Sequence, residues 1–207
     1  MVNVFIAIIC GYLLGSIPSA YIAARLKKNI DIRDVGSKNM GTLNVYYEVG
    51  LMEAALVLLA DVGKGIGAIL LARYWLEVSL VFQLFAGLAA VLGHAFPVFL
   101  KFHGGKGGAT TIAILLFFMP RAIPFFLVIA ATALLLTHNY VFCYAVAFIC
   151  FPLVAGLIYH STPLVAFSTG LPILVGINYI PRLKEMYVKA GGDWRKVIKR
   201  GGLKERL

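Results

Sequence analysis

Long runs of apolar residues, separated by short polar stretches, occupy most of the chain. A helix that crosses the hydrocarbon core of a bilayer needs roughly 20 apolar residues, and most of these runs reach that length. They predict seven transmembrane helices, with five or six as the alternatives: Val2–Leu26, Leu51–Trp75, Val78–Leu100, Gly108–Met119, Ala122–Thr137, Tyr140–Tyr159 and Pro163–Tyr179. The run at Gly108–Met119 is short for a crossing, and a turn-prone stretch at residues 15–19 interrupts the first run.

The composition agrees with a membrane protein. Of the 207 residues, 61% are hydrophobic and 14% are charged, whereas about a quarter of the residues of a soluble domain are charged. This excludes a water-soluble globule, and the abundance of large apolar residues excludes a disordered chain. We therefore expect an all-α, polytopic bundle that forms one integral membrane domain over residues 1–207.

The basic residues give the expected orientation. With seven crossings, the segments 25–50, 100–107, 138–139 and 180–207 share one side and hold sixteen of the nineteen Lys and Arg residues. An excess of Lys and Arg marks the cytoplasmic face, so the N-terminus is expected outside and the C-terminus inside. Because these residues lie between and after apolar runs, the net charge of +10 indicates anionic lipid as the partner and not nucleic acid. The basic tail from Arg182 to Leu207 is expected to lie along lipid headgroups.

The first expected cytoplasmic loop carries a candidate anion site. Its residues 36–44 read Gly-Ser-Lys-Asn-Met-Gly-Thr-Leu-Asn, and the candidate ligands are Ser37, Asn39, Gly41 and Asn44. Turns of this composition can bring backbone N–H groups and side-chain donors together around an anion. The alternative is an ordinary solvated loop with a Ser or Asn helix cap.

A second glycine-rich loop lies between two apolar runs. Gly104, Gly105, Lys106 and Gly107 place an ammonium among four glycines, counting Gly108, and the helix that follows adds the partial positive charge of its N-terminus. The loop is therefore a candidate phosphate cradle, with a flexible glycine hinge as the alternative. A glycine follows the lysine where nucleotide-binding loops need Ser or Thr, which excludes that fold. His94, at the end of the preceding run, is expected to be a hydrogen-bonded interface residue.

Asp61 and Lys64 lie inside the second apolar run. Residues three apart share one face of a helix and can pair, and buried charges in a bilayer face the bundle interior. A structural ion pair is expected, with a direct ligand role as the alternative. The four histidines have no Cys, Asp or Glu partners at metal-ligand spacing, so no metal site is expected.

The motifs together resemble those of the bacterial acyl-phosphate:glycerol-3-phosphate acyltransferases, the PlsY family. The matching segments are Ser37-Lys38-Asn39-Met40-Gly41 with Asn44, Gly93-His94 with Phe96-Pro97-Val98-Phe99, Gly104-Gly105-Lys106-Gly107 with Ala109-Thr110, Gly15-Ser16-Ile17-Pro18, and Asp61 with Lys64-Gly65. The resemblance covers nearly the whole chain.

The resemblance implies a small seven-helix protein of the bacterial plasma membrane with its active site on the cytoplasmic side. Such an enzyme transfers a fatty acyl group from acyl phosphate to glycerol 3-phosphate, as the first step of phospholipid synthesis, without metal or coenzyme. The products are lysophosphatidate and phosphate. By the motif match, Ser37, Asn39 and Asn44 bind glycerol 3-phosphate or shape its loop, the glycine loop around Lys106 forms the phosphate cradle, and His94 supports that site.

Two positions depart from the family pattern. Tyr47 occupies the place of an arginine that ends the first motif, and residues 178–185 lack the His-x-x-Asn motif expected after the last span. A tyrosine offers phosphate one neutral donor in place of a charged fork. Two alternatives therefore stay open: the same fold and donor with another acceptor or weak activity, and a non-enzymatic membrane protein that binds phosphorylated ligands.

Overall fold

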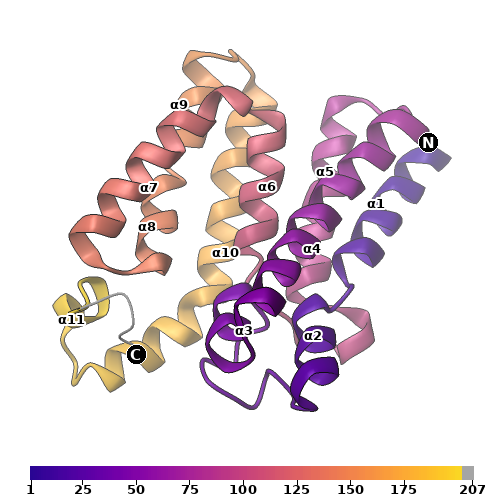
Figure 1. Ribbon diagram of the computed structural model, residues 1–207. Coiled ribbons are helices and arrows are strands. Elements are labelled where there is room, and N and C mark those ends of the chain that lie inside the picture. Colours follow the sequence, from indigo (N-terminus) through magenta and orange to yellow (C-terminus); the bar gives the residue numbers. More distant parts are fainter. Residues whose placement is uncertain (202–207) are drawn as a thin grey trace. The chain divides into compact units, whose positions relative to one another are not determined.

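The computed structural model describes residues 1–201, and every regular element in that range is a helix. The chain divides into two compact units, Met1–Phe117 and the part that begins at Phe118 (Figure 1). The all-helical architecture predicted from the apolar runs is confirmed.

The first unit contains the segments that carry the candidate site. Its elements are α1 (Val2–Gly15), α2 (Ser19–Lys28), α3 (Thr42–Glu48), α4 (Leu51–Leu70), a π-helical turn (Leu71–Trp75), α5 (Leu80–Ala95), a 3-10 turn (Val98–Leu100) and α6 (Gly108–Phe118). The predicted interruption of the first run is present, because α1 ends at Gly15 and α2 begins at Ser19. Pro18 stands at this break, where a residue without an N–H group costs no helical hydrogen bond.

The second unit is built from hairpins of shorter helices around one long helix. Its elements are a 3-10 turn (Pro120–Ala122), α7 (Ile123–Thr137), α8 (Tyr140–Ala147), α9 (Cys150–Leu157), α10 (Thr162–Lys189) and α11 (Trp194–Ile198). Among the described residues, six helical stretches are long and apolar enough to cross a membrane, and the fourth predicted span is the 11-residue helix α6.

Helices α1 and α5 pack with their backbones in contact. A Cβ atom at Gly15 would lie 2.1 Å from the carbonyl oxygen of Ala90, and one at Gly93 would lie 2.2 Å from that of Tyr12. Small residues permit this close approach between membrane helices. The packing holds the break after α1 beside the end of α5, where His94 lies.

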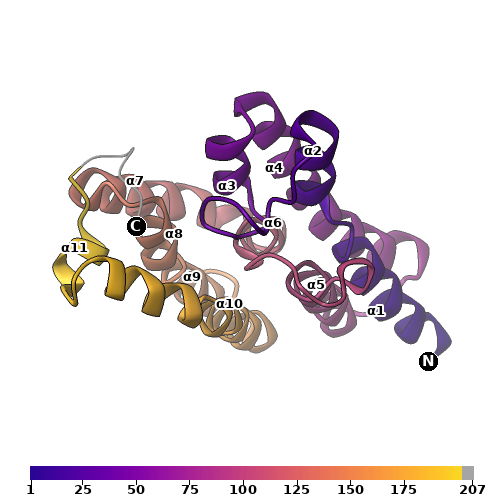
Figure 2. The ribbon, with the colours of Figure 1, turned by 90° about the horizontal axis from the view of Figure 1, so that it is seen from below.

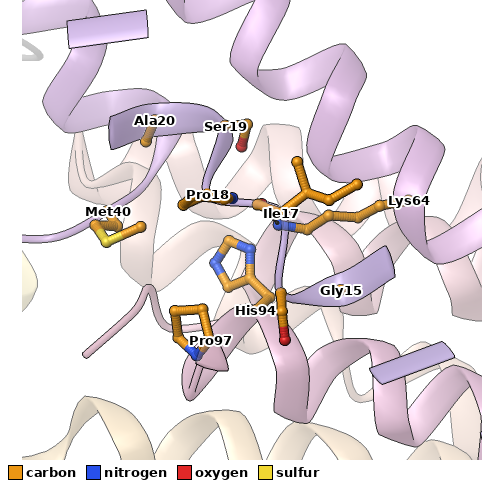
Figure 3. Close-up of a pocket in the computed structure, with 10 residues that line it drawn as sticks. Gly15, Ile17, Pro18, Ser19, Ala20, Met40, Lys64, His94 and Pro97 are labelled. Atoms are coloured by element: carbon orange, nitrogen blue, oxygen red, sulfur yellow. Dashed lines mark hydrogen bonds between the residues drawn. The ribbon is translucent and has the colours of Figure 1, made fainter. Parts of the chain in front are cut away.

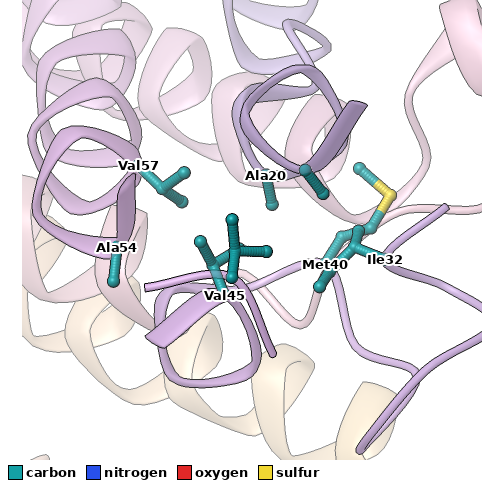
Figure 4. Close-up of a cluster of buried hydrophobic side chains, with 8 residues drawn as sticks. Ala20, Ile32, Met40, Val45, Ala54 and Val57 are labelled. Atoms are coloured by element: carbon teal, nitrogen blue, oxygen red, sulfur yellow. The ribbon is translucent and has the colours of Figure 1, made fainter. Parts of the chain in front are cut away.

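A small apolar core stabilises the loop end of the first unit, the end where the segment 29–41 connects α2 to α3. Ile32, Met40 and Val45 pack with Ala54 and Val57 of α4 and with residues of α2 (Figure 4). Helices α2, α3 and α4 lie together at this end, which Figure 2 views from below. The segment between α2 and α3 is therefore anchored at both ends and in its middle.

The last helix is longer than the sequence suggested. The predicted span Pro163–Tyr179 begins at Thr162 in the structure and continues as one helix into the basic tail, as far as Lys189. The end of the predicted tail, residues 202–207, lies outside the described residues. Glu185 pairs with Arg182 at 2.6 Å and with Lys189 at 3.0 Å. These residues are three and four positions apart, the spacings at which ion pairs stabilise a helix. Pro181 lies inside the same helix. Beyond it, the N–H of Arg200 donates to the carbonyl oxygen of Thr137 at 2.8 Å, so part of the tail binds the turn between α7 and α8.

Candidate active site

Asp61 is the centre of a buried polar cluster in the first unit. Its side chain is 1% exposed, and its Oδ1 accepts a hydrogen bond from Ser19 Oγ at 2.7 Å. Lys64 Nζ lies 2.8 Å from the same oxygen and His94 Nδ1 lies 3.5 Å from it. Thr110 Oγ1 donates to the Asp61 backbone carbonyl at 3.0 Å. One residue thus connects helices α2, α4, α5 and α6.

The ion pair expected from the spacing of Asp61 and Lys64 is present, and Lys64 does more than neutralise the carboxylate. Lys64 Nζ also donates to the carbonyl oxygen of Ile17 at 3.2 Å. That carbonyl lies in the break between α1 and α2, and it also accepts a hydrogen bond from the Ser19 N–H at 3.0 Å. The buried ammonium therefore links the backbone of the break to α4.

A narrow pocket lies over this cluster. It is lined by residues 15–20, Met40, Lys64, His94 and Pro97. In Figure 3 the His94 ring stands among Pro18, Met40 and Pro97, and the Lys64 side chain extends towards Ile17. The pocket lies at the loop end of the first unit, close to both glycine-containing loops.

The second glycine loop folds back on the end of α5. The N–H groups of Gly104 and Gly105 donate to the carbonyl oxygens of Ala95 and His94 at 3.1 and 3.0 Å. These two amides are therefore occupied within the protein. A Cβ atom at Gly105 would lie 2.2 Å from His94 Nε2 and 2.6 Å from the carbonyl oxygen of Met40. The two loops singled out in the sequence meet at this point.

Lys106 and Gly107 follow at the start of α6. Lys106 is half-buried. Gly107 has a φ of +83°, a backbone conformation that glycine adopts without strain. The Gly107 carbonyl oxygen accepts from the N–H of Thr111 at 2.9 Å and so opens α6. The ammonium of the glycine loop is thus carried at the N-terminus of that helix.

Asn44 holds the first loop in shape. It is buried, and its Oδ1 accepts from the Ser37 N–H at 2.9 Å while its Nδ2 donates to the carbonyl oxygens of Ile32 and Val35 at 3.0 and 3.1 Å. Arg33 and Asp31 form a two-bond ion pair in the same loop, and the Arg33 guanidinium lowers the pKa of that carboxyl. The structure therefore assigns Asn44 to shaping the loop.

Several polar atoms near the meeting point of the loops are buried without a hydrogen-bond partner among the described residues. They are Asn39 Oδ1, Thr42 Oγ1, Thr111 Oγ1 and also His94 Nδ1, which lies 3.5 Å from Asp61 Oδ1 without a hydrogen bond. Gly41 lies against the first of these side chains, since a Cβ atom there would be 2.8 Å from Asn39 Nδ2. Buried polar groups in proteins nearly always have partners, so these atoms are suited to contact a ligand or water.

Sequence reasoning gave Ser19 and Thr110 no role of their own and did not connect His94 with Asp61. The sequence offered only a weak signal for these two residues. Ser19 is a hydroxyl residue directly after a helix break, and Thr110 is one in the first helical turn after a glycine loop. These residues lie 42 and 49 positions from Asp61 in the chain. Only the packing of four helices brings them together. Within the described part of the chain, no group of three or more His, Cys, Asp or Glu side chains is placed to hold a metal ion.

With this geometry established, comparison with known proteins identifies the family. A sequence model of the family described as glycerol-3-phosphate acyltransferase matches residues 5–188. The chain belongs to the glycerol-3-phosphate acyltransferase family. Among its relatives, glycerol-3-phosphate acyltransferase 2 of Dehalococcoides mccartyi strain 195 is 45% identical over 208 residues, which cover 100% of this chain and 99% of the relative. The glycerol-3-phosphate acyltransferase of Thermoanaerobacter sp. strain X514 is 36% identical and covers 86% and 89% of the two chains.

Solved structures agree with this assignment. The crystal structure of PlsY (YgiH), an integral membrane glycerol 3-phosphate acyltransferase, in its glycerol 3-phosphate form matches with a TM-score of 0.81 and 28% identity, covering 92% of this chain and 94% of that one. The lysophosphatidic acid form of the same enzyme matches with a TM-score of 0.79 and 27% identity, covering 92% and 93%. The PlsY resemblance stated from the motifs is confirmed, and the chain has the fold of an integral membrane acyltransferase.

Proposed function

We propose that this protein transfers a fatty acyl group from acyl phosphate to glycerol 3-phosphate. A hydroxyl oxygen of glycerol 3-phosphate bonds to the acyl carbonyl carbon, and the bond from that carbon to the phosphate oxygen breaks. The hydroxyl proton leaves with the phosphate, so the products are lysophosphatidate and inorganic phosphate. Family membership supports the acceptor, since the related PlsY was crystallised in glycerol 3-phosphate and lysophosphatidic acid forms.

The observation that carries the proposal is the contact between the two loops at Met40 and Gly105, beside the buried Asp61 cluster. Both substrates bear phosphate, and a site for them needs donors and positive charge from more than one segment. The first loop contributes hydroxyl and amide side chains, and the second contributes an ammonium at the start of a helix. Phosphate groups bind well where such donors meet a helix N-terminus.

The site residues have two proposed roles. Ser37, Asn39, Gly41, Lys106 and Gly107 are proposed to contact the substrates. Asn44, Gly104 and Gly105 are positioning residues, because their hydrogen bonds hold the two loops in shape, and His94 is a positioning residue because its ring lies against Gly105. The ion pair of Asp61 and Lys64 is proposed to stabilise the packing of α4 against the neighbouring helices. Asn44 and the two glycine amides thus move from candidate ligands to supports of the site.

Catalysis in this site would come from alignment and from charge stabilisation. Binding both substrates in one site converts a bimolecular step into an effectively unimolecular one. The Lys106 ammonium and the α6 N-terminus would stabilise the negative charge that develops on the carbonyl oxygen and the departing phosphate. An acyl phosphate is already activated, so the proposed reaction uses no metal and no coenzyme.

The proposed setting is the bacterial plasma membrane, with the loop end of the first unit on the cytoplasmic side and the N-terminus outside. The orientation follows from the Lys and Arg residues that the loops carry, because such residues are in excess on the cytoplasmic side. Since the family match runs from residue 5 to residue 188 across both units, we propose that they act as one acyltransferase domain.

The test is an assay of the purified full-length protein with acyl phosphate and labelled glycerol 3-phosphate. Labelled lysophosphatidate and free phosphate should form in equal amounts. Lys106→Ala should lower kcat/KM by at least about tenfold, the loss expected when one charged contact to phosphate is removed. Lys101→Ala is the matched control, because Lys101 is exposed and lies outside the glycine run. Full activity of Lys106→Ala would refute the proposed cradle.

A second candidate keeps the donor and changes the acceptor, and it rests on Tyr47. This residue lies in α3 and is half-buried, and its ring packs edge-on against Tyr46 with centroids 5.0 Å apart. Phosphate release that does not increase when glycerol 3-phosphate is added would favour this candidate over the first.

A further inference from the structure

The second unit contains a cavity to which the proposed reaction assigns no role. Its volume is about 350 Å³, within the range of about 300–1,000 Å³ typical of pockets that bind small molecules. It lies among α8, α10 and α11, and every residue that lines it belongs to this unit. The Asp61 cluster and both glycine loops belong to the other unit.

The cavity wall is almost entirely apolar. It includes Phe142, Phe148, Val175, Leu183, Met186 and Val197. The polar side chain of Asn139 at its edge is already engaged: Nδ2 donates to the Val197 carbonyl oxygen at 2.8 Å, and Oδ1 accepts from the Val141 N–H at 3.1 Å. Tyr144, Tyr179 and Trp194 also line the cavity and carry polar atoms. Most of the wall is nevertheless apolar, and a wall of this kind fits a hydrocarbon chain.

The cavity lies along the C-terminal half of α10. This helix has 28 residues and is therefore about 42 Å long, whereas the hydrocarbon core is about 30 Å thick. The last turns of α10, with Arg182 and Lys189, thus leave the hydrocarbon and reach the headgroups. A ligand in the cavity would extend from the depth of acyl chains to the depth of phosphates.

Positive charge surrounds the headgroup end of the cavity. Residues 182–200 contain seven basic and two acidic residues. Both acidic side chains have partners, because Glu185 binds Arg182 and Lys189, and Asp193 accepts from the Arg195 N–H at 2.8 Å. Arg195, Lys196 and Lys199 are exposed. Trp194 lines the cavity and stacks on Tyr187 with centroids 4.6 Å apart, and such aromatic residues favour the membrane interface.

We propose that this cavity binds one acyl chain of an anionic membrane phospholipid, whose phosphate contacts the basic residues of α11 and the end of α10. The apolar wall selects hydrocarbon, and the surrounding cations select a negative headgroup. Helix α11 closes the cavity at the headgroup depth. The proposal does not rest on the reaction proposed above, so it stands or fails independently of that activity.

Fluorescence quenching of Trp194 tests the proposal directly. The chain has two tryptophans, so Trp75→Phe leaves Trp194 as the only one. This full-length variant is placed in phosphatidylcholine vesicles that contain increasing amounts of phosphatidylglycerol brominated on its acyl chains. Quenching should saturate, at a mole fraction lower than that needed with brominated phosphatidylcholine by a factor of about five for each basic residue that contacts the headgroup.

Two glycines of α10 give a matched pair of blocking variants. Gly176 lines the cavity and Gly170 does not, and a Cβ atom at either would meet no atom within 4 Å. Gly176→Phe should fill the cavity and reduce the saturable quenching several-fold, whereas Gly170→Phe should leave it unchanged. Neutralising Arg195, Lys196 and Lys199 together to Gln should remove the preference for phosphatidylglycerol.

Three results would overturn the proposal. They are equal quenching curves for Gly176→Phe and Gly170→Phe, equal quenching by the two brominated lipids, and displacement of the brominated lipid by acyl phosphate at equal concentration. The last would assign the cavity to a substrate chain. Native mass spectrometry of the unmodified protein provides a second measurement that does not depend on the tryptophan variant, and it should detect one retained phosphatidylglycerol.

Discussion

The N–H of Gly105 donates to the backbone carbonyl oxygen of His94 at 3.0 Å, while the imidazole of the same histidine lies against the Gly105 Cα. The imidazole and the glycine loop therefore fix each other. The other ring nitrogen of His94 lies 3.5 Å from the Asp61 carboxylate. The proposed phosphate cradle is thus separated from the buried ion pair of α4 by one side chain, that of His94.

Gly105→Ala should disrupt the site, because its methyl group would overlap both the imidazole of His94 and the carbonyl oxygen of Met40. Overpacking of this kind costs about 1–3 kcal/mol of folding stability, and we expect kcat/KM to fall by more than about tenfold. Thermal unfolding in detergent and the acyltransfer assay measure the two effects. Gly67→Ala in α4 is the control, since a Cβ atom there meets no atom within 4 Å. Wild-type values for Gly105→Ala would contradict the close packing described here.

Asp61→Ala should be among the most destabilising single changes in the first unit. It leaves Lys64 buried without its counter-charge, and breaking a buried ion pair costs about 3–5 kcal/mol. The double variant Asp61→Ala/Lys64→Met should lose less stability than the sum of the two single variants. Unfolding by denaturant gives the four free energies of this double-mutant cycle.

The pair Lys27–Glu53, at 3.1 Å, is the control for that cycle, because its lysine is exposed and the pair lies at the protein surface. Surface pairs are screened by solvent, so its coupling should be much smaller than that of Asp61 and Lys64. Equal coupling in the two cycles would show that the buried pair has no special structural role.

The two asparagines of the first loop should behave differently. Asn44→Ala removes three hydrogen bonds within the loop and should lower stability by about 1–3 kcal/mol. Asn39→Ala removes a side chain whose Oδ1 binds nothing in the described structure, so stability should stay near that of the unmodified protein while KM for glycerol 3-phosphate rises. Measuring the melting temperature and KM of both variants separates the roles. The same loss of stability in both would contradict this division.

Tyr47→Arg should lower KM for glycerol 3-phosphate by about tenfold, because a charge-assisted bond to phosphate replaces a neutral one. The neighbouring Tyr46→Arg is the control, since Tyr46 is exposed and does not occupy the motif position. Steady-state kinetics at saturating acyl phosphate give the comparison. An unchanged KM would indicate that residue 47 lies away from the acceptor phosphate.

The membrane helices could be predicted because each is encoded locally by a run of apolar residues. The break at Pro18 and the pairing of Asp61 with Lys64 are local as well, and both are present in the structure. The helix over Thr42–Glu48 was not predicted, since its seven residues show no clear periodicity. The continuation of α10 to Lys189 was missed because Pro181 and the charged residues after it look like a helix end.

The composition of the polar cluster could not be predicted. Ser19, His94 and Thr110 come from three different helices, and nothing local to any of them indicates Asp61 as the partner. Asn44 shows the same limit, since a polar side chain in a glycine-containing loop has the same sequence signature whether it binds a ligand or its own backbone. Only the three-dimensional positions of Ile32, Val35 and Ser37 around it distinguish the two roles.

The contact between α1 and α5 has a consequence for how the protein accommodates its ligands. At Gly11, Gly15 and Gly93 one helix backbone rests on the other, so no side chain lies between them that could change rotamer and let the helices slide. The pair of helices α1 and α5 beside the pocket is therefore rigid. Any adjustment to a long or bulky substrate therefore has to come from segments outside this contact between the two helices.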